Sequence, residues 1–290
     1  MEKLCSQCPR ACGCDRVRGV GFCGTKENFK IARAGLHAWE EPCVSGTRGS
    51  GTVFFTGCNL GCVFCQNEEI SAEYKGREIT PERLKAIFAE LAAQGAHNIN
   101  LVTPTHYTEQ LLPLLDDVPL PVVWNSSAYE SVETLKKLEG KVNIYLPDLK
   151  FGLPEPARKY AHAPDYPEIA KAAILEMFRQ RGPCRFDTDG LIVSGVILRH
   201  LILPENAENT LAVIDWVAEH FPHGEALFSL MSQYTPYRTL PYPELNRRLT
   251  KAEYIRARNY MLKKGIREGF VQELSSAKEE YTPAFDFTGV

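Results

Sequence analysis

The stretch that decides the fold of this chain is Thr56-Gly57-Cys58-Asn59-Leu60-Gly61-Cys62-Val63-Phe64-Cys65-Gln66-Asn67. Its three cysteines, Cys58, Cys62 and Cys65, come directly after a predicted strand over residues 53–56. Three thiolates from one tight loop can hold three corners of a cubane iron–sulfur cluster. No fourth cysteine follows closely, so one iron lacks a protein ligand, and an open metal position is where such a site performs chemistry. The spacing therefore predicts a 4Fe-4S cluster with one iron open to a second molecule.

Zinc binding and reduced structural thiols are the two alternative explanations of these cysteines, because spacing alone does not name a metal. Zinc motifs usually combine two Cys-x-x-Cys pairs. This loop instead has one narrower pattern, with the aromatic residue Phe64 directly before the third cysteine. The pattern therefore favours an iron–sulfur cluster over zinc.

The composition is that of an ordinary globular protein. With 290 residues, the chain can form one large α/β domain and a small appendage. A hydrophobic content of 44%, a charged content of 24% and a net charge of -3 give no reason to expect a nucleic-acid or membrane partner. The first residues lack the apolar core of a signal peptide, and no apolar run approaches about 18 residues. We therefore expect a cytoplasmic protein.

The cysteines divide the chain unevenly, since nine of the ten come before residue 66. This clustering indicates metal binding and reduced thiols rather than the disulfides of a secreted protein. We divide the chain into a Cys-rich N-terminal segment (1–45), a barrel (46–275) and a C-terminal tail (276–290). The first segment has little periodic hydrophobicity, so we expect a metal to organise it. Its four candidate ligands are Cys5, Cys8, Cys12 and Cys23, with Cys14 as a spare thiol.

The metal in this N-terminal segment is either a second iron–sulfur cluster or a structural zinc ion, since four thiolates suit both. We favour the iron–sulfur cluster. Free thiols are the third possibility.

Short β-rich runs alternate with helical patterns from residue 52 onwards, which indicates parallel βαβ units. We expect strands over residues 53–56, 98–102, 122–124, 143–146, 196–203 and 227–231. Helices are expected over residues 81–94, 108–115, 132–138, 167–180, 207–220 and 250–263. Six such units favour an α/β fold, a partial (β/α)6 TIM-like barrel, with a doubly wound sheet as the alternative.

Polar residues follow the predicted strands at the ends where a barrel has its active site. In chain order they are the cysteine loop, His106 in Thr103-Pro104-Thr105-His106, Asn125 and Ser127, Asp148 and Lys150, and Gln233. Arg199 interrupts an otherwise apolar strand, and an unpaired buried guanidinium is very costly. Arg199 therefore needs a partner, either a bound carboxylate or a structural salt bridge. Its neighbour His200 points to the other face and is expected either in the core or behind the residues that touch the ligand.

The cysteine loop, including Phe64, resembles the signature of the radical S-adenosylmethionine (SAM) superfamily, over most of residues 52–270. This resemblance implies that SAM chelates the open iron and that its reductive cleavage gives a 5′-deoxyadenosyl radical. It also implies that Phe64 lies against the adenine, that Asn125 and Ser127 lie near the ribose, and that Arg199 suits the SAM carboxylate. Ordinary core packing is the alternative for Phe64.

Asp148-Leu149-Lys150 is similar to the motif at the SAM site of pyruvate formate-lyase activating enzymes. Thr103-Pro104-Thr105-His106 departs from the superfamily, which usually has Gly-Gly-Glu here to hold the SAM amino group. His106 falls near the glutamate position, where a neutral imidazole or a threonine carbonyl could accept from the ammonium. With 229–236 (Ser-Leu-Met-Ser-Gln-Tyr-Thr-Pro), this stretch looks like an uncharacterised branch of activating-enzyme-like proteins.

The resemblance implies a radical SAM enzyme that activates a partner glycyl-radical enzyme by hydrogen abstraction. A flavodoxin or ferredoxin-type protein would donate the electron. The first alternative is hydrogen abstraction from a small molecule or another peptide. The second is a non-catalytic iron–sulfur electron carrier, which does not require the polar residues at the strand ends.

Overall fold

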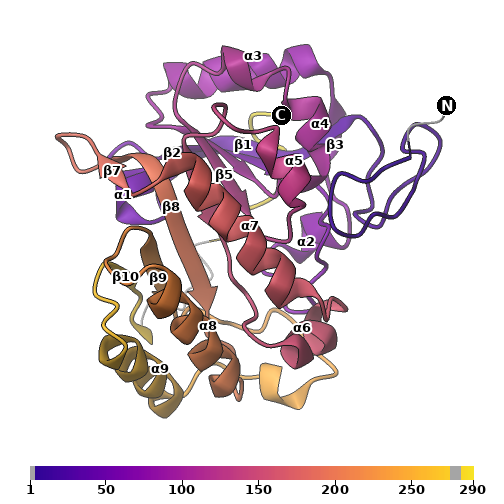
Figure 1. Cartoon of the computed structure of the whole chain (residues 1–290). Coiled ribbons are helices and arrows are strands. Elements are labelled where there is room, and N and C mark those ends of the chain that lie inside the picture. The colour runs from indigo at the N-terminus through magenta and orange to yellow at the C-terminus, as the bar shows by residue number, and fades with distance from the viewer. Residues whose placement is uncertain (1–3, 275–281) are drawn as a thin grey trace.

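A computed structural model describes residues 4–274 and 282–290 and shows a largely parallel sheet (Figure 1). Its parallel strands are β2 (Ser50–Phe55), β4 (Ile99–Val102), β5 (Val122–Ser126), β6 (Ile144–Pro147), β8 (Ile192–Leu201), β9 (Leu227–Met231) and β10 (Gly269–Val271). The strands neighbour one another in chain order, β10-β9-β8-β6-β5-β4-β2. A doubly wound sheet would reverse direction part-way through this order. The α/β partial barrel is confirmed.

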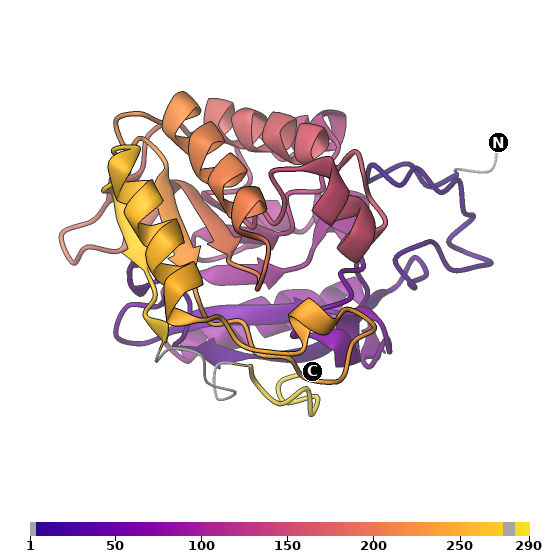
Figure 2. The same cartoon turned by 90° about the horizontal axis from the view of Figure 1, so that it is seen from below.

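The helices cover the outer face of the sheet (Figure 2). They include α3 (Pro81–Ala93), α4 (Thr108–Leu111), α5 (Val132–Lys136), α6 (Pro154–Ala161), α7 (Tyr166–Arg181), α8 (Ala207–His220) and α9 (Lys251–Lys263). Helix α3 begins as expected, because Thr80 accepts from the N–H of Arg83 and Pro81 occupies the first turn. Its apolar face, with Leu84, Phe88 and Leu91, is buried in the main core.

Two expectations about helices differ from the structure. The helix expected over residues 108–115 ends at Leu111, and a short 3-10 turn, η2 (Leu115–Asp117), follows it. Pro113 explains the break, since proline has no N–H to donate and clashes with the preceding turn. Helix α6 was not expected, because its sequence PEPARKYA contains few apolar residues.

The sheet also begins earlier than expected. Strand β1 (Phe29–His37) pairs antiparallel with β2 and, through its first residues, with β3 (Arg77–Ile79). Residues 29–37 fall within the segment assigned to the Cys-rich part, yet they form an edge of the barrel sheet. The buried residues of β1 include Ile31 and Ala34, which join the main core. The remaining strand, β7 (Arg185–Phe186), pairs with β8.

The C-terminal tail lies against β1. The N–H of Ala34 donates to the carbonyl of Thr288 (2.9 Å), and the N–H of Phe287 donates to the carbonyl of Ala32 (3.0 Å). Residues 276–281 of the expected tail lie outside the described residues. The remaining short helices are α1 (Pro42–Ser45), α2 (Glu68–Ser71), η1 (Thr105–Tyr107) and η3 (Pro243–Leu245). Within residues 4–274 and 282–290, no helix combines the length and apolarity that crossing a membrane requires.

Candidate functional site

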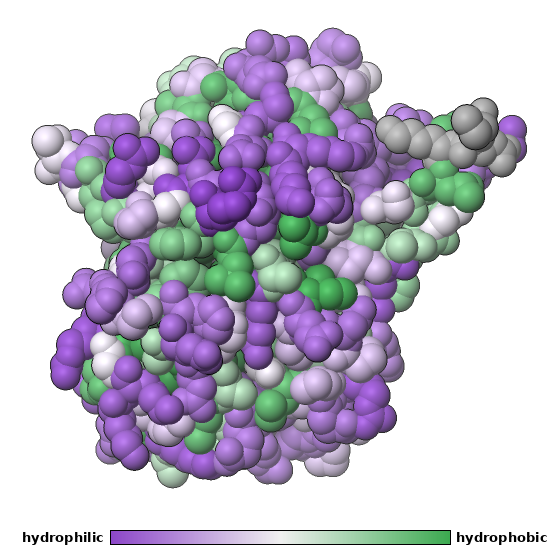
Figure 3. Space-filling view, viewed as in Figure 1, coloured by the Kyte–Doolittle hydropathy of each residue, from purple (hydrophilic) through white to green (hydrophobic). Residues whose placement is uncertain are grey.

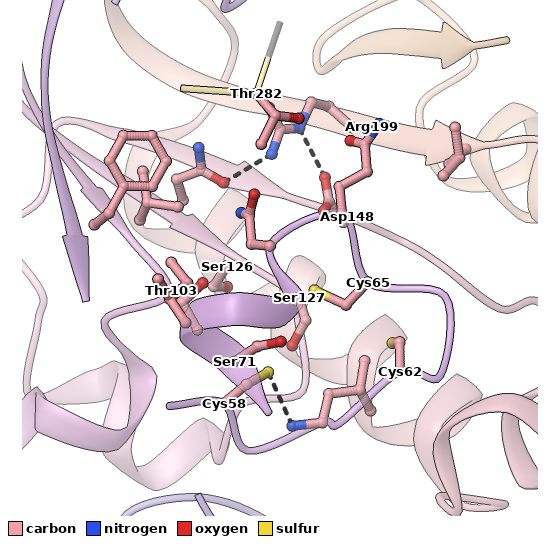
Figure 4. Close-up of a pocket in the computed structure, with 18 of the residues that line it drawn as sticks. Cys58, Cys62, Cys65, Ser71, Thr103, Ser126, Ser127, Asp148, Arg199 and Thr282 are labelled. Atoms are coloured by element: carbon pink, nitrogen blue, oxygen red, sulfur yellow. Dashed lines mark hydrogen bonds and ion pairs between the residues drawn. The ribbon is translucent and has the colours of Figure 1, made fainter. Parts of the chain in front are cut away.

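A cavity of about 210 Å³ opens where the parallel strands end (Figure 4). Parallel strands bring their carboxyl ends to one rim, and loops at that rim carry the active sites of barrel enzymes. The lining includes the three loop cysteines and seven of the polar or aromatic residues expected at the site: Phe64, Asn125, Ser127, Asp148, Lys150, Arg199 and Gln233. The structure thus brings together residues that are up to 175 positions apart in the sequence.

The cysteine loop leaves the end of β2 and turns at two glycines with positive φ, Gly57 (89°) and Gly61 (72°). A Cβ at Gly57 would lie 2.4 Å from the carbonyl oxygen of Cys23, so glycine is required there. Burial raises the pKa of the Cys58 and Cys62 thiols, and the ammonium of Lys150 opposes this effect at both. Binding of a metal must therefore displace protons from the buried thiols.

Arg199 connects three parts of the cavity wall. Its Nε donates to Oδ1 of Asp148 (2.7 Å), and its Nη2 donates to Oδ1 of Asn125 (2.7 Å). Its Nη1 donates to Oε2 of Glu40 (2.8 Å). The guanidinium is 13% exposed and faces the cavity in Figure 4. The structural salt bridge is therefore present, and the side chain still borders the space where a ligand would lie.

Asp148 is held between two cations. Besides Arg199, the Nζ of Lys150 donates to its Oδ2 (2.7 Å). Burial alone would raise the pKa of Asp148, but Arg199 and Lys150 outweigh burial and hold that pKa below its ordinary value. The carboxylate therefore stays ionised, and it keeps the ammonium of Lys150 near the cysteine loop.

Phe64 both packs in the core and lines the cavity, which are the two positions considered for it from the sequence. Its ring is 9% exposed and packs edge to face against Phe151, Tyr160 and Tyr234, with centroids 6.1–6.3 Å away. The same ring lines the cavity. An aromatic face in this position can both seal the core and stack against a planar ligand.

His106 does not line the cavity. Its imidazole is buried behind the cysteine loop, with Nε2 2.8 Å from the carbonyl oxygen of Thr56. Its pKa is lowered to about 3, mainly by burial and to a smaller extent by the charge of Arg16, while the hydrogen bond to Thr56 acts in the opposite direction. The structure does not bring His106 to the cavity with the other predicted site residues, because the 3-10 turn η1 directs this side chain into the core.

Thr103 lines the cavity directly after the end of β4. Its φ is 59°, a left-handed conformation that is rare for a β-branched residue. Strain of this kind costs on the order of 1–3 kcal/mol and persists where the surrounding structure enforces it. The N–H of Thr103 donates to the carbonyl of Asn125 (2.8 Å), which fixes the turn.

Sequence reasoning missed the contribution of residues after β1. His37, Trp39 and Glu40 line the cavity, although they precede the predicted barrel. Glu40 also accepts from Asn100 (3.0 Å) and Asn125 (3.2 Å) through Oε1. Arg199 was the one sign in the sequence that a carboxylate should lie nearby, because a buried guanidinium requires a partner of opposite charge. Nothing in the sequence shows that Glu40 supplies it.

Glu41 is buried beside the same network, with Oε2 3.8 Å from Arg199. Burial raises its pKa, Arg199 opposes this effect, and the carboxylate of Glu40 adds to it. His200 behaves as expected of a core residue, since both ring nitrogens are bonded away from the cavity.

The N-terminal segment projects from the side of the barrel, near α2 and β3 (Figure 1). Across residues 4–274 and 282–290, no three His, Cys, Asp or Glu side chains converge closely enough to hold a single metal ion. This finding includes Cys58, Cys62 and Cys65, whose thiols also lie too far apart to hold one ion. A cubane cluster separates its ligands by its own iron and sulfide atoms, so this finding bears on a mononuclear zinc site rather than on a cluster.

The comparisons with known proteins agree with this site. The sequence pattern of the radical SAM superfamily matches residues 52–223. The uncharacterized protein MJ0674 of Methanocaldococcus jannaschii is 33% identical over 267 residues, which cover 88% of this chain and 73% of that protein. The chain belongs to the radical SAM superfamily and is a radical SAM enzyme related to that archaeal protein.

Two solved structures are similar to this chain at lower sequence identity. Streptococcus suis SuiB bound to S-adenosylmethionine is 13% identical with a TM-score of 0.47, over 77% of this chain and 47% of SuiB. Methylornithine synthase (PylB) is 17% identical with a TM-score of 0.48, over 74% of this chain and 60% of the synthase.

Membership of the superfamily implies a 4Fe-4S cluster and SAM as cofactors, and the residues present fit both. Three thiols line one cavity, and no fourth cysteine is among the cavity-lining residues that the structure describes. The remaining lining combines an aromatic ring, carboxylates, amides and cations, which suits a ligand with an adenine, a ribose and an amino acid end.

Proposed function

We propose that this radical SAM enzyme abstracts a hydrogen atom from a glycine of a partner protein, and so activates a glycyl-radical enzyme. The observation that carries the proposal is the Asp148–Lys150 pair beside the cysteine loop, because this motif resembles that of pyruvate formate-lyase activating enzymes. Asp148 lies at the end of β6, and Lys150 is close enough to Cys62 to oppose the rise in its thiol pKa.

When bound, the cluster and SAM supply reductive cleavage of a carbon–sulfur bond and a 5′-deoxyadenosyl radical. The protein's part is to bind, orient and exclude water. Cys58, Cys62 and Cys65 would hold the cluster. Lys150 offsets the negative charge of the thiolates, and Phe64 covers the apolar side of the cavity.

The Arg199 network would orient SAM. Arg199 fixes Asp148, Asn125 and Glu40 in one arrangement, and all four side chains line the cavity. Asn125, Ser127 and Gln233 offer hydrogen bonds suited to ribose hydroxyls. With His106 turned into the core, the carbonyl of the strained Thr103 is our candidate acceptor for the SAM amino group.

Two alternatives accompany this proposal. Hydrogen abstraction from a small molecule or another peptide uses the same site and differs only in the substrate. A non-catalytic electron carrier is disfavoured, since a carrier does not need the polar cavity and membership of the superfamily implies enzymatic chemistry. For both enzymatic functions we propose that a separate flavodoxin or ferredoxin-type protein donates the electron.

The test is co-expression of the chain with a candidate glycyl-radical enzyme, followed by anaerobic electron paramagnetic resonance. We expect a glycyl radical on the partner with the wild-type chain and none with the Cys58→Ala/Cys62→Ala/Cys65→Ala variant. Formation of 5′-deoxyadenosine without any glycyl radical would contradict the proposed substrate and favour a small molecule.

A further inference from the structure

We propose that Cys5, Cys8, Cys12 and Cys23 bind a second iron–sulfur cluster that passes electrons to the cluster at Cys58, Cys62 and Cys65. The inference rests on the first cluster, which superfamily membership implies, and not on the identity of the substrate.

The N-terminal cysteines are drawn together by backbone pairing. The N–H of Cys5 donates to the carbonyl of Cys14 (3.0 Å), and the N–H of Gly13 donates back to the carbonyl of Cys5 (3.1 Å). The N–H of Ala11, next to Cys12, donates to the carbonyl of Cys8 (3.0 Å). The thiols of Cys23 and Cys5 also lie close enough to Cys8 for their charges to affect it. The four cysteines thus belong to one segment of 19 residues whose backbone folds back on itself.

Gly21 lies beside two of the proposed ligands, Cys12 and Cys23. A Cβ on Gly21 would lie 3.3 Å from the sulfur of Cys12 and 3.6 Å from that of Cys23. The sulfur of Cys14 instead lies beside Gly19, 3.6 Å from the corresponding position. The N–H of Gly24 donates to the carbonyl of Gly21 (2.9 Å), which turns the backbone around Cys23.

The two cysteine sets are joined through the backbone. The N–H of Cys58 donates to the carbonyl of Cys23 (3.3 Å). A ligand of one cluster is therefore hydrogen-bonded to a ligand of the other. Arg10 adds two bonds to the cysteine loop, from Nε to the carbonyl of Asn59 and from Nη2 to that of Leu60 (both 2.9 Å). The N-terminal segment therefore contacts the cysteine loop at Cys58 and at the two residues that follow it.

The segment also offers a surface for a protein donor. Its exposed apolar side chains are those of Leu4 (57%), Val17 (69%), Val20 (57%) and Phe22 (47%). In Figure 3 the arm that projects near the N-terminus carries hydrophobic surface beyond the body of the molecule. Small apolar surfaces are typical of brief contacts between proteins.

The relay step is a transfer of one electron. A reduced flavodoxin or ferredoxin-type protein loses one electron and the second cluster gains it. The second cluster is reoxidised when that electron reaches the first. No bond forms or breaks, and no proton needs to move.

The test uses the full chain, reconstituted anaerobically, and measures iron, sulfide and zinc per chain. We expect about eight irons in the wild type and a loss of about four in Cys5→Ala/Cys8→Ala, as for one cubane cluster. Cys14→Ala is the matched control in the same segment and Cys184→Ala the control outside it; both should keep their iron. Loss of one zinc ion, an unchanged iron content in the double variant, or loss of iron in Cys14→Ala would overturn the assigned site.

The relay is tested by the rate of 5′-deoxyadenosine formation with reduced flavodoxin, divided by the rate with dithionite. We expect this ratio to fall in Cys5→Ala/Cys8→Ala and to stay at the wild-type value in Cys14→Ala. If the N-terminal segment only stabilises the cysteine loop, the rate with flavodoxin and the rate with dithionite would fall together, and their ratio would not change. That result would overturn the relay, as would an unchanged ratio in a variant that has lost four irons.

Discussion

Arg199 is the residue on which the shape of the cavity depends most. It donates to Asp148, Asn125 and Glu40 from three different elements of the chain. We expect Arg199→Lys to lower the free energy of unfolding by about 1–3 kcal/mol and to weaken SAM binding, because lysine cannot span three acceptors with a planar fork. Chemical denaturation and equilibrium SAM binding measure the two effects.

Arg179 provides the control for this substitution. It also bonds two carboxylates, those of Glu139 and Glu176, but its side chain is 52% exposed. Arg179→Lys should change the free energy of unfolding by less than about 1 kcal/mol, as for surface ion pairs. Equal effects of the two substitutions would contradict the role given to Arg199.

His200 gives the protein a measurable dependence on pH. Its ring lies 2.7 Å from the carbonyl of Leu149 and 3.0 Å from the hydroxyl of Thr210, and burial lowers its pKa from 6.5 to about 4. The unfolded chain therefore binds a proton that the folded chain does not. This contribution to stability is complete above about pH 6.5 and is lost as the pH falls towards about 4.

We expect His200→Gln to show a shallower loss of unfolding free energy than the wild type across this pH window. Urea denaturation of both chains at several pH values measures the slopes. Because other buried groups titrate in both chains, the difference between the slopes isolates His200. Parallel slopes would show that its pKa is not depressed in the folded protein.

At the scale of elements, the described part of the C-terminal tail closes one side of the sheet. Phe285 is 4% exposed and packs edge to face on Phe54 of β2, with ring centroids 5.5 Å apart. Thr282 and Pro283 line the cavity. We expect Phe285→Ala to lower the free energy of unfolding by about 3–5 kcal/mol, the usual range for a buried phenylalanine. Phe186→Ala, at a residue 46% exposed, is the control and should change it little.

Six of the seven parallel strands in the described part of the chain were predicted, because each contains a short apolar run between turn signals, whereas β10 was missed. The sequence predicted β1 poorly, because Phe29–His37 includes charged residues and glycine and follows a segment rich in cysteine. Residues 42–45 and 68–71 form helices too short to show a period. Whether an edge strand joins a sheet depends on its partner, and β1 is held by β2, β3 and the tail.

The candidate site was likewise predicted only in part. Cys58, Cys62 and Cys65 were predictable because their spacing within one loop determines their geometry. Asn125, Asp148 and Arg199 were predictable because strand ends meet at one rim. Glu40 was not, since its position depends on a long-range ion pair. His106 was expected at the cavity, but the 3-10 turn η1 directs its side chain into the core, and nothing in the sequence indicated this turn.

For the whole molecule, the two parts of the chain depend on each other. The barrel presents the cysteine loop at its rim, and the N-terminal segment contacts that loop from the other side through Cys23 and Arg10. The loop therefore lies between a cavity suited to SAM and a second set of thiols. This arrangement is the structural basis for both proposals.

The central claim is that Cys58, Cys62 and Cys65 hold the cluster at which SAM is cleaved. The most direct measurement is the formation of methionine and 5′-deoxyadenosine by anaerobically reconstituted protein with dithionite. We predict equal amounts of both products from the wild type, and only background from a soluble Cys58→Ala/Cys62→Ala/Cys65→Ala variant that has lost about four irons. Continued formation of 5′-deoxyadenosine by that variant would contradict the account.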